Sequence, residues 1–154
     1  MNCDQDDKKV KTMPLLVDQH LCFALYSANL AMNKVYRQLL SQLDITYPQY
    51  LVMLVLWQKD DVTVSEIGEQ LFLDSATLTP LLKRLESAGL INRQRTRQDE
   101  RQVAVTLTDA GQALRARAEA IPEAVKCATA CDDDALLALK LQLDGLRDNL
   151  NQSR

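Results

Sequence analysis

Hydrophobic residues recur every three or four positions over most of this chain, a spacing that predicts amphipathic helices. The first such segment runs to about Leu43, and Asp18 is placed to cap its N-terminus. Its apolar positions are Leu21, Leu25, Leu30, Val35 and Leu39. The last segment carries leucines in a 3-4-3-4 spacing at Leu136, Leu139, Leu143, Leu146 and Leu150. That spacing places a single apolar seam along one face of a C-terminal helix.

Between these segments, two capping boxes mark the starts of shorter helices. Thr46 pairs with Gln49, and Pro48 lies in the first turn, where a missing N–H costs least. We expect this helix over residues 47–58 to be buried, because it is apolar nearly all round. Thr63 and Glu66 form the second capping box, and Val64, Ile67 and Leu71 give the helix that follows one apolar stripe.

A further helix carries Leu78, Leu81, Leu82 and Leu85 and ends at Gly89. Pro80 lies inside it and cannot donate to the carbonyl four residues back, so either the helix starts after Ser75 or its first turn is irregular.

After this helix the period changes to two, which predicts strands. "LINRQR" and "QVAVTLT" alternate, and "TRQDER" between them is long enough only for a hairpin connection. Val103, Val105 and Leu107 share one side of the second strand. Thr108 and Asp109 then restart a helix, which Pro122 bends or breaks. Two short helices followed by a ribbon predict a winged helix-turn-helix, in a mainly α fold with a small β-wing.

The distribution of charge along the chain indicates that this motif binds DNA. The net charge is −3, but residues 83–97 hold five cations against Glu86 alone, a net of +4. A helix fits the major groove and a basic hairpin beside it can reach the backbone. The candidate DNA contacts are Ser75, Thr77 and Thr79 at the front of the helix, Lys83 and Arg84 further along, Arg93, Arg95 and Arg97 alternating on one face of the ribbon, and Arg101 just beyond its tip. The alternative is a protein-binding winged helix whose arginines are simply solvated.

The length and amino-acid composition limit the classes of protein to which the chain can belong. With 154 residues, 47% of them apolar and 25% charged, the chain has the size and content of one globular domain. Its longest apolar run, residues 50–57, is far shorter than the roughly 20 residues that span a bilayer. The polar N-terminus lacks the apolar core of a signal peptide. We therefore expect a soluble, cytoplasmic protein.

The remaining candidates for a chemical role are the four cysteines, Cys3, Cys22, Cys127 and Cys131. A reducing compartment disfavours a structural disulfide framework. Without a C-x-x-C motif and with only His20, which we expect in a capping turn or at the surface, a zinc site is not expected, nor is any cofactor. Cys127 and Cys131 would share a face if their segment is helical. Transient redox chemistry is the leading role, and for Cys22 a buried, inert thiol is the alternative.

The order of helices, the wing and the "DER" step at residues 99–101 resemble the MarR family of dimeric repressors, over nearly the whole chain after the first dozen residues. The resemblance implies one domain over 15–154, in which 15–45 and 108–154 interlock two subunits, after a flexible tail over 1–14. It implies that 46–107 binds pseudo-palindromic double-stranded operator DNA. The resemblance also implies that "DSATLTPLLKRL" is the recognition helix, Pro80 included, and that Arg101 enters the minor groove, braced by Asp99.

Within that family, "LCFALYSA", Tyr36 and "TYPQYLVMLVLW" are similar to the organic-hydroperoxide-sensing OhrR branch. This resemblance implies that Cys22 reacts with peroxide and that Tyr36 and Tyr47, from the other subunit, hydrogen-bond its sulfur. It further implies that Cys127 is the resolving thiol of a two-cysteine subgroup. Helix geometry agrees in part, because Cys22 and Tyr36, 14 residues apart, would be separated by about 21 Å on one straight helix. Tyr26, one turn from Cys22, lies on the same face.

Cysteine oxidation supplies a switch. The reacting species is the thiolate, which a position near a helix N-terminus favours. A sulfenic acid then condenses with a second thiol to a disulfide. That thiol is Cys127 by resemblance, with Cys131 as a substitute and Cys3 as a bystander.

We therefore expect a homodimeric repressor, not an enzyme, that senses organic hydroperoxides through Cys22. An intersubunit disulfide with Cys127 would release the operator and derepress a peroxide-detoxification gene. One alternative is a repressor released by a small phenolic or lipophilic ligand held between the dimer helices and the DNA-binding part. Another is a thiol peroxidase, which shares the first chemical step but must turn over.

Overall fold

The computed structural model describes residues 14–153, so Cys3 and nearly all of the expected N-terminal tail lie outside the described residues. The chain forms two compact units. Residues 31–125 are called the lobe below, and residues up to 30 together with those from 126 onward are called the terminal unit.

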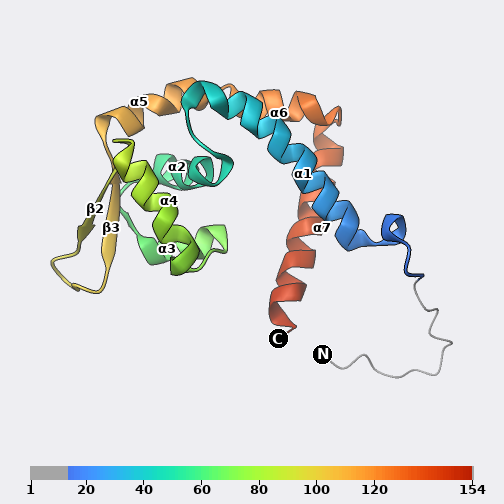
Figure 1. Ribbon diagram of the computed structural model, residues 1–154, viewed down its shortest axis with the longest axis horizontal. Coiled ribbons are helices and arrows are strands. Elements are labelled where there is room, and N and C mark those ends of the chain that lie inside the picture. Colours follow the sequence, from blue (N-terminus) through green and yellow to red (C-terminus); the bar gives the residue numbers. More distant parts are fainter. Residues whose placement is uncertain (1–13, 154) are drawn as a thin grey trace. The chain divides into compact units, whose positions relative to one another are not determined.

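The elements are a 3₁₀ turn at Val17–Gln19, α1 (Leu21–Leu40), a 3₁₀ turn at Ser41–Leu43, α2 (Tyr47–Gln58), β1 (Val62–Thr63), α3 (Val64–Leu71), α4 (Ser75–Ser87), β2 (Ile91–Arg95), β3 (Val103–Leu107), α5 (Asp109–Ala118), α6 (Ile121–Thr129) and α7 (Asp133–Gln152) (Figure 1).

Both predicted capping boxes are confirmed. The Thr46 hydroxyl accepts from the backbone N–H of Gln49, whose side chain accepts from the backbone N–H of Thr46 at 2.9 Å. Thr63 and Glu66 make the same reciprocal pair at the start of α3. Each box satisfies two amide groups that a helix start leaves without a partner, which is why α2 and α3 begin where the sequence predicted.

The start of α4 differs from the prediction. Asp74 caps it by accepting from the backbone N–H of Thr77 at 2.7 Å, and this hydrogen bond holds the pKa of the carboxyl below its usual value. The helix begins at Ser75 with a regular bond from Leu78 N to the Asp74 carbonyl, so both the later start and the irregular first turn expected from Pro80 were wrong. The carbonyl of Ala76 loses its donor at Pro80, but Ala76 is exposed and water can replace that donor.

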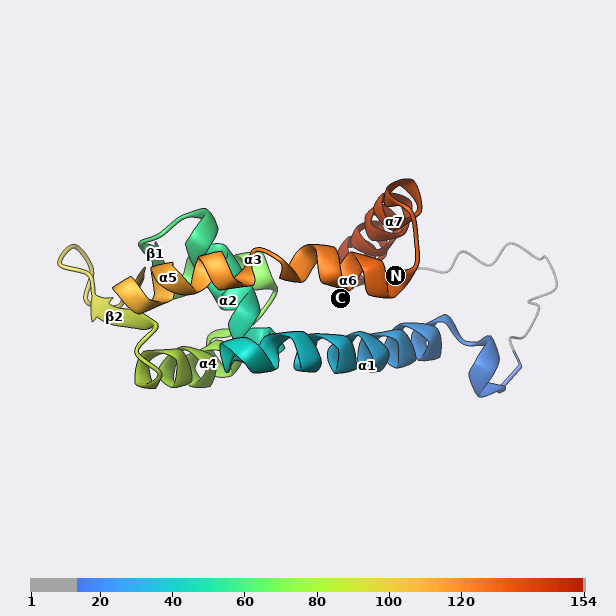
Figure 2. The same ribbon diagram turned by 90° about the horizontal axis from the view of Figure 1, so that it is seen from above.

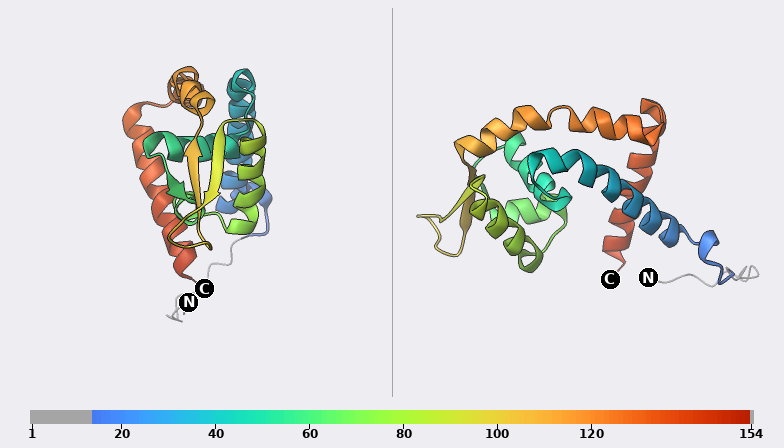
Figure 3. Two further views of the ribbon diagram at one scale, coloured as in Figure 1. Left: turned by 90° about the vertical axis from the view of Figure 1, so that its left-hand side faces the viewer. Right: turned by 45° about the horizontal axis from the view of Figure 1, so that its top comes forward.

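The strands form one antiparallel sheet in the order β1-β3-β2. β2 and β3 are the predicted hairpin, with Arg93 opposite Val105. Val105 is fully buried, but Ala104 and Thr106 are partly buried like Val103 and Leu107, so burial does not alternate along β3 as predicted. β1, only two residues long, is too short to show a period and was not predicted. Figure 3 (left) shows the hairpin beside α4.

The lobe has a single core to which α2, α3, α4 and the sheet contribute. Its most fully buried large side chains are Leu40, Val52, Met53, Leu56, Ile67, Leu78, Leu82, Leu85, Ile91 and Val105. α2 is buried as predicted along most of its length, although Leu54 remains 39% exposed. This core holds α4 with its apolar side inward, and its other side is turned outward.

The first helix starts later than predicted. Asp18 lies in a 3₁₀ turn and does not cap α1, because the extended backbone of His20 separates the two. α1 begins at Leu21 and runs unbroken to Leu40 (Figure 2). Cys22 is therefore the second residue of the helix, closer to its N-terminus than an Asp18 cap would place it.

The C-terminal segment follows its predicted breaks, with one correction. α5 ends at Ala118 and Pro122 lies in the first turn of α6, as a proline-induced break requires. α6 ends at Thr129 and Ala130 has φ +52°, so Cys131 lies in the turn before α7 and does not share a helix face with Cys127. The described part of the chain contains no helix long and apolar enough to cross a membrane.

Candidate functional site

The outward side of α4 presents short polar side chains and two cations. Ser75, Thr77, Pro80, Lys83 and Arg84 are exposed. Thr79 is the exception among the predicted contacts, because it is partly buried and its hydroxyl donates to the Ser75 carbonyl at 2.7 Å. The fully buried leucines of the inner side fix the helix, so these groups are held on a rigid element.

At the root of the wing, Arg93 is paired within the protein. Its backbone N–H donates to Oε2 of Glu86 at 3.1 Å, and its guanidinium donates to both carboxylate oxygens, at 3.4 and 3.1 Å. These hydrogen bonds and the positive charge of Arg93 hold the pKa of Glu86 below its usual value. β2 ends at Arg95, so the predicted alternation covers Arg93 and Arg95 but does not extend to Arg97.

At the tip, backbone contacts order the turn. Asp99 N–H donates to the Thr96 hydroxyl at 3.1 Å, and Thr96 donates back to the Asp99 carbonyl at 2.7 Å. The Asp99 carboxylate accepts from the backbone N–H of Arg101 at 3.0 Å, so here it braces the main chain that carries Arg101. Arg95 donates to the Glu100 carbonyl at 3.3 Å across the tip.

Arg97 and Arg101 are both exposed, and the structure gives their guanidinium groups no hydrogen-bond or ion-pair partner among the described residues. With Lys83 and Arg84 they form a set of exposed cations on α4 and the wing. Exposed Arg and Lys side chains beside a presented helix are the groups that bind phosphates and base edges of duplex DNA.

The thiols occupy a different part of the chain. Cys22, Cys127 and Cys131 are free and exposed. For the chain by itself, Cys22 is therefore not buried, as the alternative required, and its reactivity stays a prediction. Tyr26, one turn along α1, is 62% exposed. Cys131 Sγ donates to the Thr129 carbonyl at 3.2 Å within its turn.

The predicted tyrosines form a cluster in the lobe. The ring centroids of Tyr36 and Tyr47 lie 4.3 Å apart, and Tyr50, not singled out from the sequence, lies 5.9 Å from Tyr36 and 6.4 Å from Tyr47. Burial, helped by the two neighbouring phenols, raises the pKa of Tyr36 to about 12. Burial also raises the pKa of Tyr47. Both hydroxyls therefore stay protonated at neutral pH and can donate hydrogen bonds. The spacing of three residues from Tyr47 to Tyr50 was the available sequence signal.

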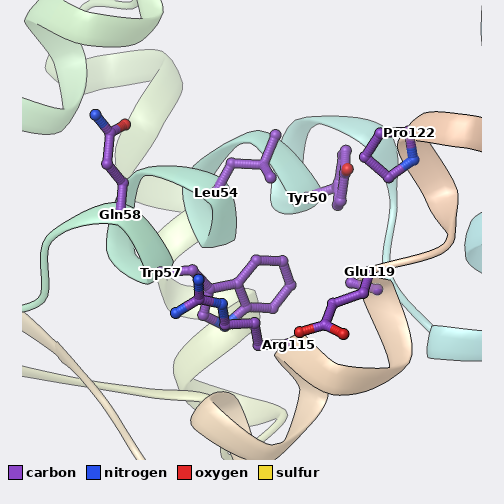
Figure 4. Close-up of a pocket in the computed structure, with 8 residues that line it drawn as sticks. Tyr50, Leu54, Trp57, Gln58, Arg115, Glu119 and Pro122 are labelled. Carbon is purple, nitrogen blue, oxygen red and sulfur yellow. The ribbon is translucent and has the colours of Figure 1, made fainter.

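A pocket of about 530 Å³ opens in the lobe. Figure 4 shows its walls, with α2 on one side and the segment from α5 into α6 on the other. The lining residues are Tyr50, Leu54, Trp57, Gln58, Arg115, Ala118, Glu119 and Pro122. Trp57 also donates to the Gly111 carbonyl at 2.9 Å, which joins α2 to α5. No sequence pattern indicated this pocket, because its walls lie more than 50 residues apart.

Residues 34–117 match a family model described as "Transcriptional regulator SarA/Rot". The HTH-type transcriptional regulator TtmR of Methylorubrum extorquens (strain PA1) is 49% identical over 138 residues, which cover 90% of this chain and 71% of TtmR. The organic hydroperoxide resistance transcriptional regulator of Bacillus subtilis (strain 168) is 45% identical over 136 residues, 88% of this chain and 92% of that protein.

Among solved structures, AbfR of Staphylococcus epidermidis is 39% identical and superposes with a TM-score of 0.70 over 85% of this chain and 91% of AbfR. AbfR has been solved reduced on DNA, overoxidized on DNA and in a disulfide form. These similarities confirm the predicted resemblance and the predicted fold class. The chain belongs to the SarA/Rot/MarR-type family of winged-helix transcriptional regulators, in the branch of the organic hydroperoxide resistance regulators.

Proposed function

We propose that this protein is a cytoplasmic, homodimeric repressor that senses organic hydroperoxides by oxidation of Cys22. An intersubunit disulfide with Cys127 then releases pseudo-palindromic operator DNA and derepresses a gene for hydroperoxide detoxification. The observation that carries the proposal is an exposed thiol at the second residue of α1, in a chain 45% identical to a regulator of organic hydroperoxide resistance.

The first step needs the thiolate of Cys22. The positive end of the α1 dipole favours that anion in the first turn. The sulfur attacks an oxygen of the hydroperoxide, so an S–O bond forms, the O–O bond breaks, and the peroxide is reduced to an alcohol that carries away a proton. The protonated hydroxyls of Tyr36 and Tyr47, from the other subunit, donate hydrogen bonds to the sulfur and stabilise its charge.

The second step forms the disulfide. The Cys127 thiol attacks the sulfenic sulfur of Cys22, an S–S bond replaces the S–O bond, and water leaves. We assign DNA release to this step. In AbfR, the reduced and the overoxidized forms were both solved on DNA, which supports a role for the disulfide rather than for charge on the sulfur.

The test is a DNA-binding titration on a duplex that the reduced protein selects from a random library. One equivalent of cumene hydroperoxide per subunit should abolish binding and give a covalent dimer on a non-reducing gel. Cys22→Ser should bind the duplex normally and ignore the oxidant. Cys127→Ser should keep its DNA after oxidation, whereas the control variant Cys131→Ser should behave as wild type. If oxidant changes neither binding nor the gel, the redox proposal is wrong.

The DNA-binding half of the proposal rests on the exposed cations of the wing. Arg101→Ala should weaken binding in the reduced protein by about 1–3 kcal/mol if it contacts bases or phosphate as proposed. Gln98→Ala, a change at an exposed residue in the same turn, is the matched control. A wild-type affinity for Arg101→Ala would remove that residue from the interface.

The lobe pocket favours a second candidate, a repressor released by a small phenolic or lipophilic ligand. Its walls combine the aromatic rings of Tyr50 and Trp57 with the charged groups of Arg115 and Glu119. Release by an unreactive aromatic compound from Cys22→Ser would support this candidate. Release of the wild type by hydroperoxide alone, with Cys22→Ser unresponsive, would support the redox switch.

A further inference from the structure

The recognition helix and the wing are joined by one carboxylate. Glu86 lies in the last turn of α4, seven residues before Arg93 on β2. Its two oxygens accept the backbone N–H and two guanidinium N–H groups of Arg93. Charge-assisted bonds with this paired geometry are among the stronger hydrogen bonds in proteins.

The same pairing changes what Arg93 can do. Only 22% of its side chain is exposed, and the nearby anion neutralises its charge. Binding to a phosphate gains free energy largely by releasing counterions from DNA, which a neutralised guanidinium does poorly. Arg97 and Arg101 at the tip carry no such partner among the described residues. The wing arginines therefore fall into two kinds.

The connection between Glu86 and Arg93 is also ordered by backbone hydrogen bonds, from Gly89 to the Glu86 carbonyl, from Leu90 to the Leu85 carbonyl and from Thr108 to the Leu90 carbonyl. It turns at Gly89, with φ +76°, whose carbonyl accepts from the Thr108 hydroxyl at 2.6 Å. Ile91, 1% exposed, inserts into the core on the same side of β2 as Arg93. Beyond Ile91, the Glu86 carboxylate makes the hydrogen bonds from α4 to β2. β3 pairs with β2 through the hairpin register and is itself held by its pairing with β1 and by the buried Val105.

We propose that Glu86 is a positioning residue for operator binding, which holds the wing at a set place relative to the recognition helix through Arg93. Arg93 contributes to affinity through this attachment and not by neutralising a phosphate. The inference rests on the proposed DNA-binding function and deepens it. It distinguishes residues that contact DNA from residues that hold those contacting residues in place.

The direction in which one substitution changes DNA affinity tests the positioning role of Glu86. By simple electrostatics, removing an anion from a DNA-binding surface should tighten binding. If Glu86 aims the wing, Glu86→Gln should instead weaken binding of the selected duplex, by about tenfold for loss of a charged hydrogen-bonding pair. Glu69→Gln removes an exposed carboxylate from α3 and is the matched control, expected to bind as tightly as wild type or slightly tighter.

The salt dependence of binding tests the role of Arg93. Titrations of the full-length reduced protein by fluorescence anisotropy, at several salt concentrations, give the slope of log K against log salt. Arg97→Gln should lower that slope by about 0.9, the value for one lost phosphate contact. Arg93→Gln should weaken binding with the wild-type slope. The Glu86→Gln/Arg93→Gln double variant should bind no more weakly than either single variant, because the two residues act as one unit.

The outcomes distinguish failure of the proposed DNA-binding function from failure of the positioning role of Glu86. A wild-type protein that selects no duplex overturns the proposed function. Tight wild-type binding that Glu86→Gln leaves unchanged or strengthens overturns only the positioning role, as does a slope lowered by about one in Arg93→Gln. Thermal melting of each variant identifies unfolding. If Glu86→Gln melts early, Glu86→Asp, which keeps the charge on a shorter arm, must restore binding for the proposal to stand.

Discussion

In the lobe, α2 buries residues on nearly every side, and the fully buried positions of the described chain all lie between residues 40 and 125. In the terminal unit, α7 has no buried side chain and leaves Leu137, Leu139, Leu141, Leu143 and Leu150 exposed by 37% or more. Both regions are helical and leucine-rich, yet only the lobe encloses its leucines. Exposed apolar surface of this extent marks an interaction site.

The lobe buries its apolar side chains within itself, whereas the terminal helices do not. The lobe has its own core, helix caps and sheet. The terminal helices leave their leucines exposed, and we expect the second copy of the proposed dimer to cover them. Cys22, Cys127 and the exposed Tyr26 lie on these same helices. The proposed redox chemistry is therefore located where stability depends on assembly.

The largest expected effect is in the lobe. Leu56→Ala removes a side chain that is 1% exposed, so it should lower the free energy of unfolding by about 2–5 kcal/mol through lost burial and a cavity. Urea denaturation measures this. The loss should persist at every protein concentration, and a loss below about 1 kcal/mol would contradict the lobe core described here.

The matched truncation in the terminal unit is Leu143→Ala. Leu143 is 37% exposed in the single chain, and we expect the second copy of the proposed dimer to bury it. We expect a weaker dimer, by about tenfold or more in Kd, and a stability loss that shrinks as protein concentration rises. Sedimentation at several concentrations measures the first quantity. A loss independent of concentration would instead place Leu143 in a core within one chain.

Alkaline pH should affect the lobe through its tyrosine cluster. The pKa of Tyr36 is raised to about 12, so its stabilising contribution is complete below pH 10 and is lost as pH rises from about 10 toward 12. Urea midpoints should fall across that range. They should fall less in Tyr36→Phe, and an equal fall in both proteins would show that Tyr36 is not the cause.

We expect the smallest losses of stability from substitutions of helix-capping residues, one in the lobe and one in the terminal unit. Thr46→Ala should destabilise the lobe by about 1 kcal/mol. Asp132 caps α7 by accepting from Ala135 N–H at 2.7 Å, and Asp132→Ala removes a comparable bond. We expect its cost to appear in the dimer dissociation constant rather than in lobe unfolding. Equal effects of both variants on lobe unfolding would weaken the distinction between the units.

Features that depend on a few neighbouring residues could be predicted without the structure. The capping boxes of α2 and α3, the hairpin, the break at Pro122 and the family itself were all predictable, because caps, alternation and motifs act within about four residues. The sequence also pointed to Cys22 and to the exposed arginines of the wing, and their roles in sensing and DNA contact remain proposals.

Which side chains meet beyond the reach of such local motifs became known only from the folded arrangement of the chain. It paired Arg93 with Glu86, brought Tyr50 to Tyr36, and opened the pocket between α2 and α5. It also tolerated Pro80 within a regular α4, where the residue that loses its donor, Ala76, is exposed and water can replace that donor. Packing sets such contacts, and packing depends on the whole core at once, so a local pattern such as the spacing of Tyr47 and Tyr50 could only hint at them.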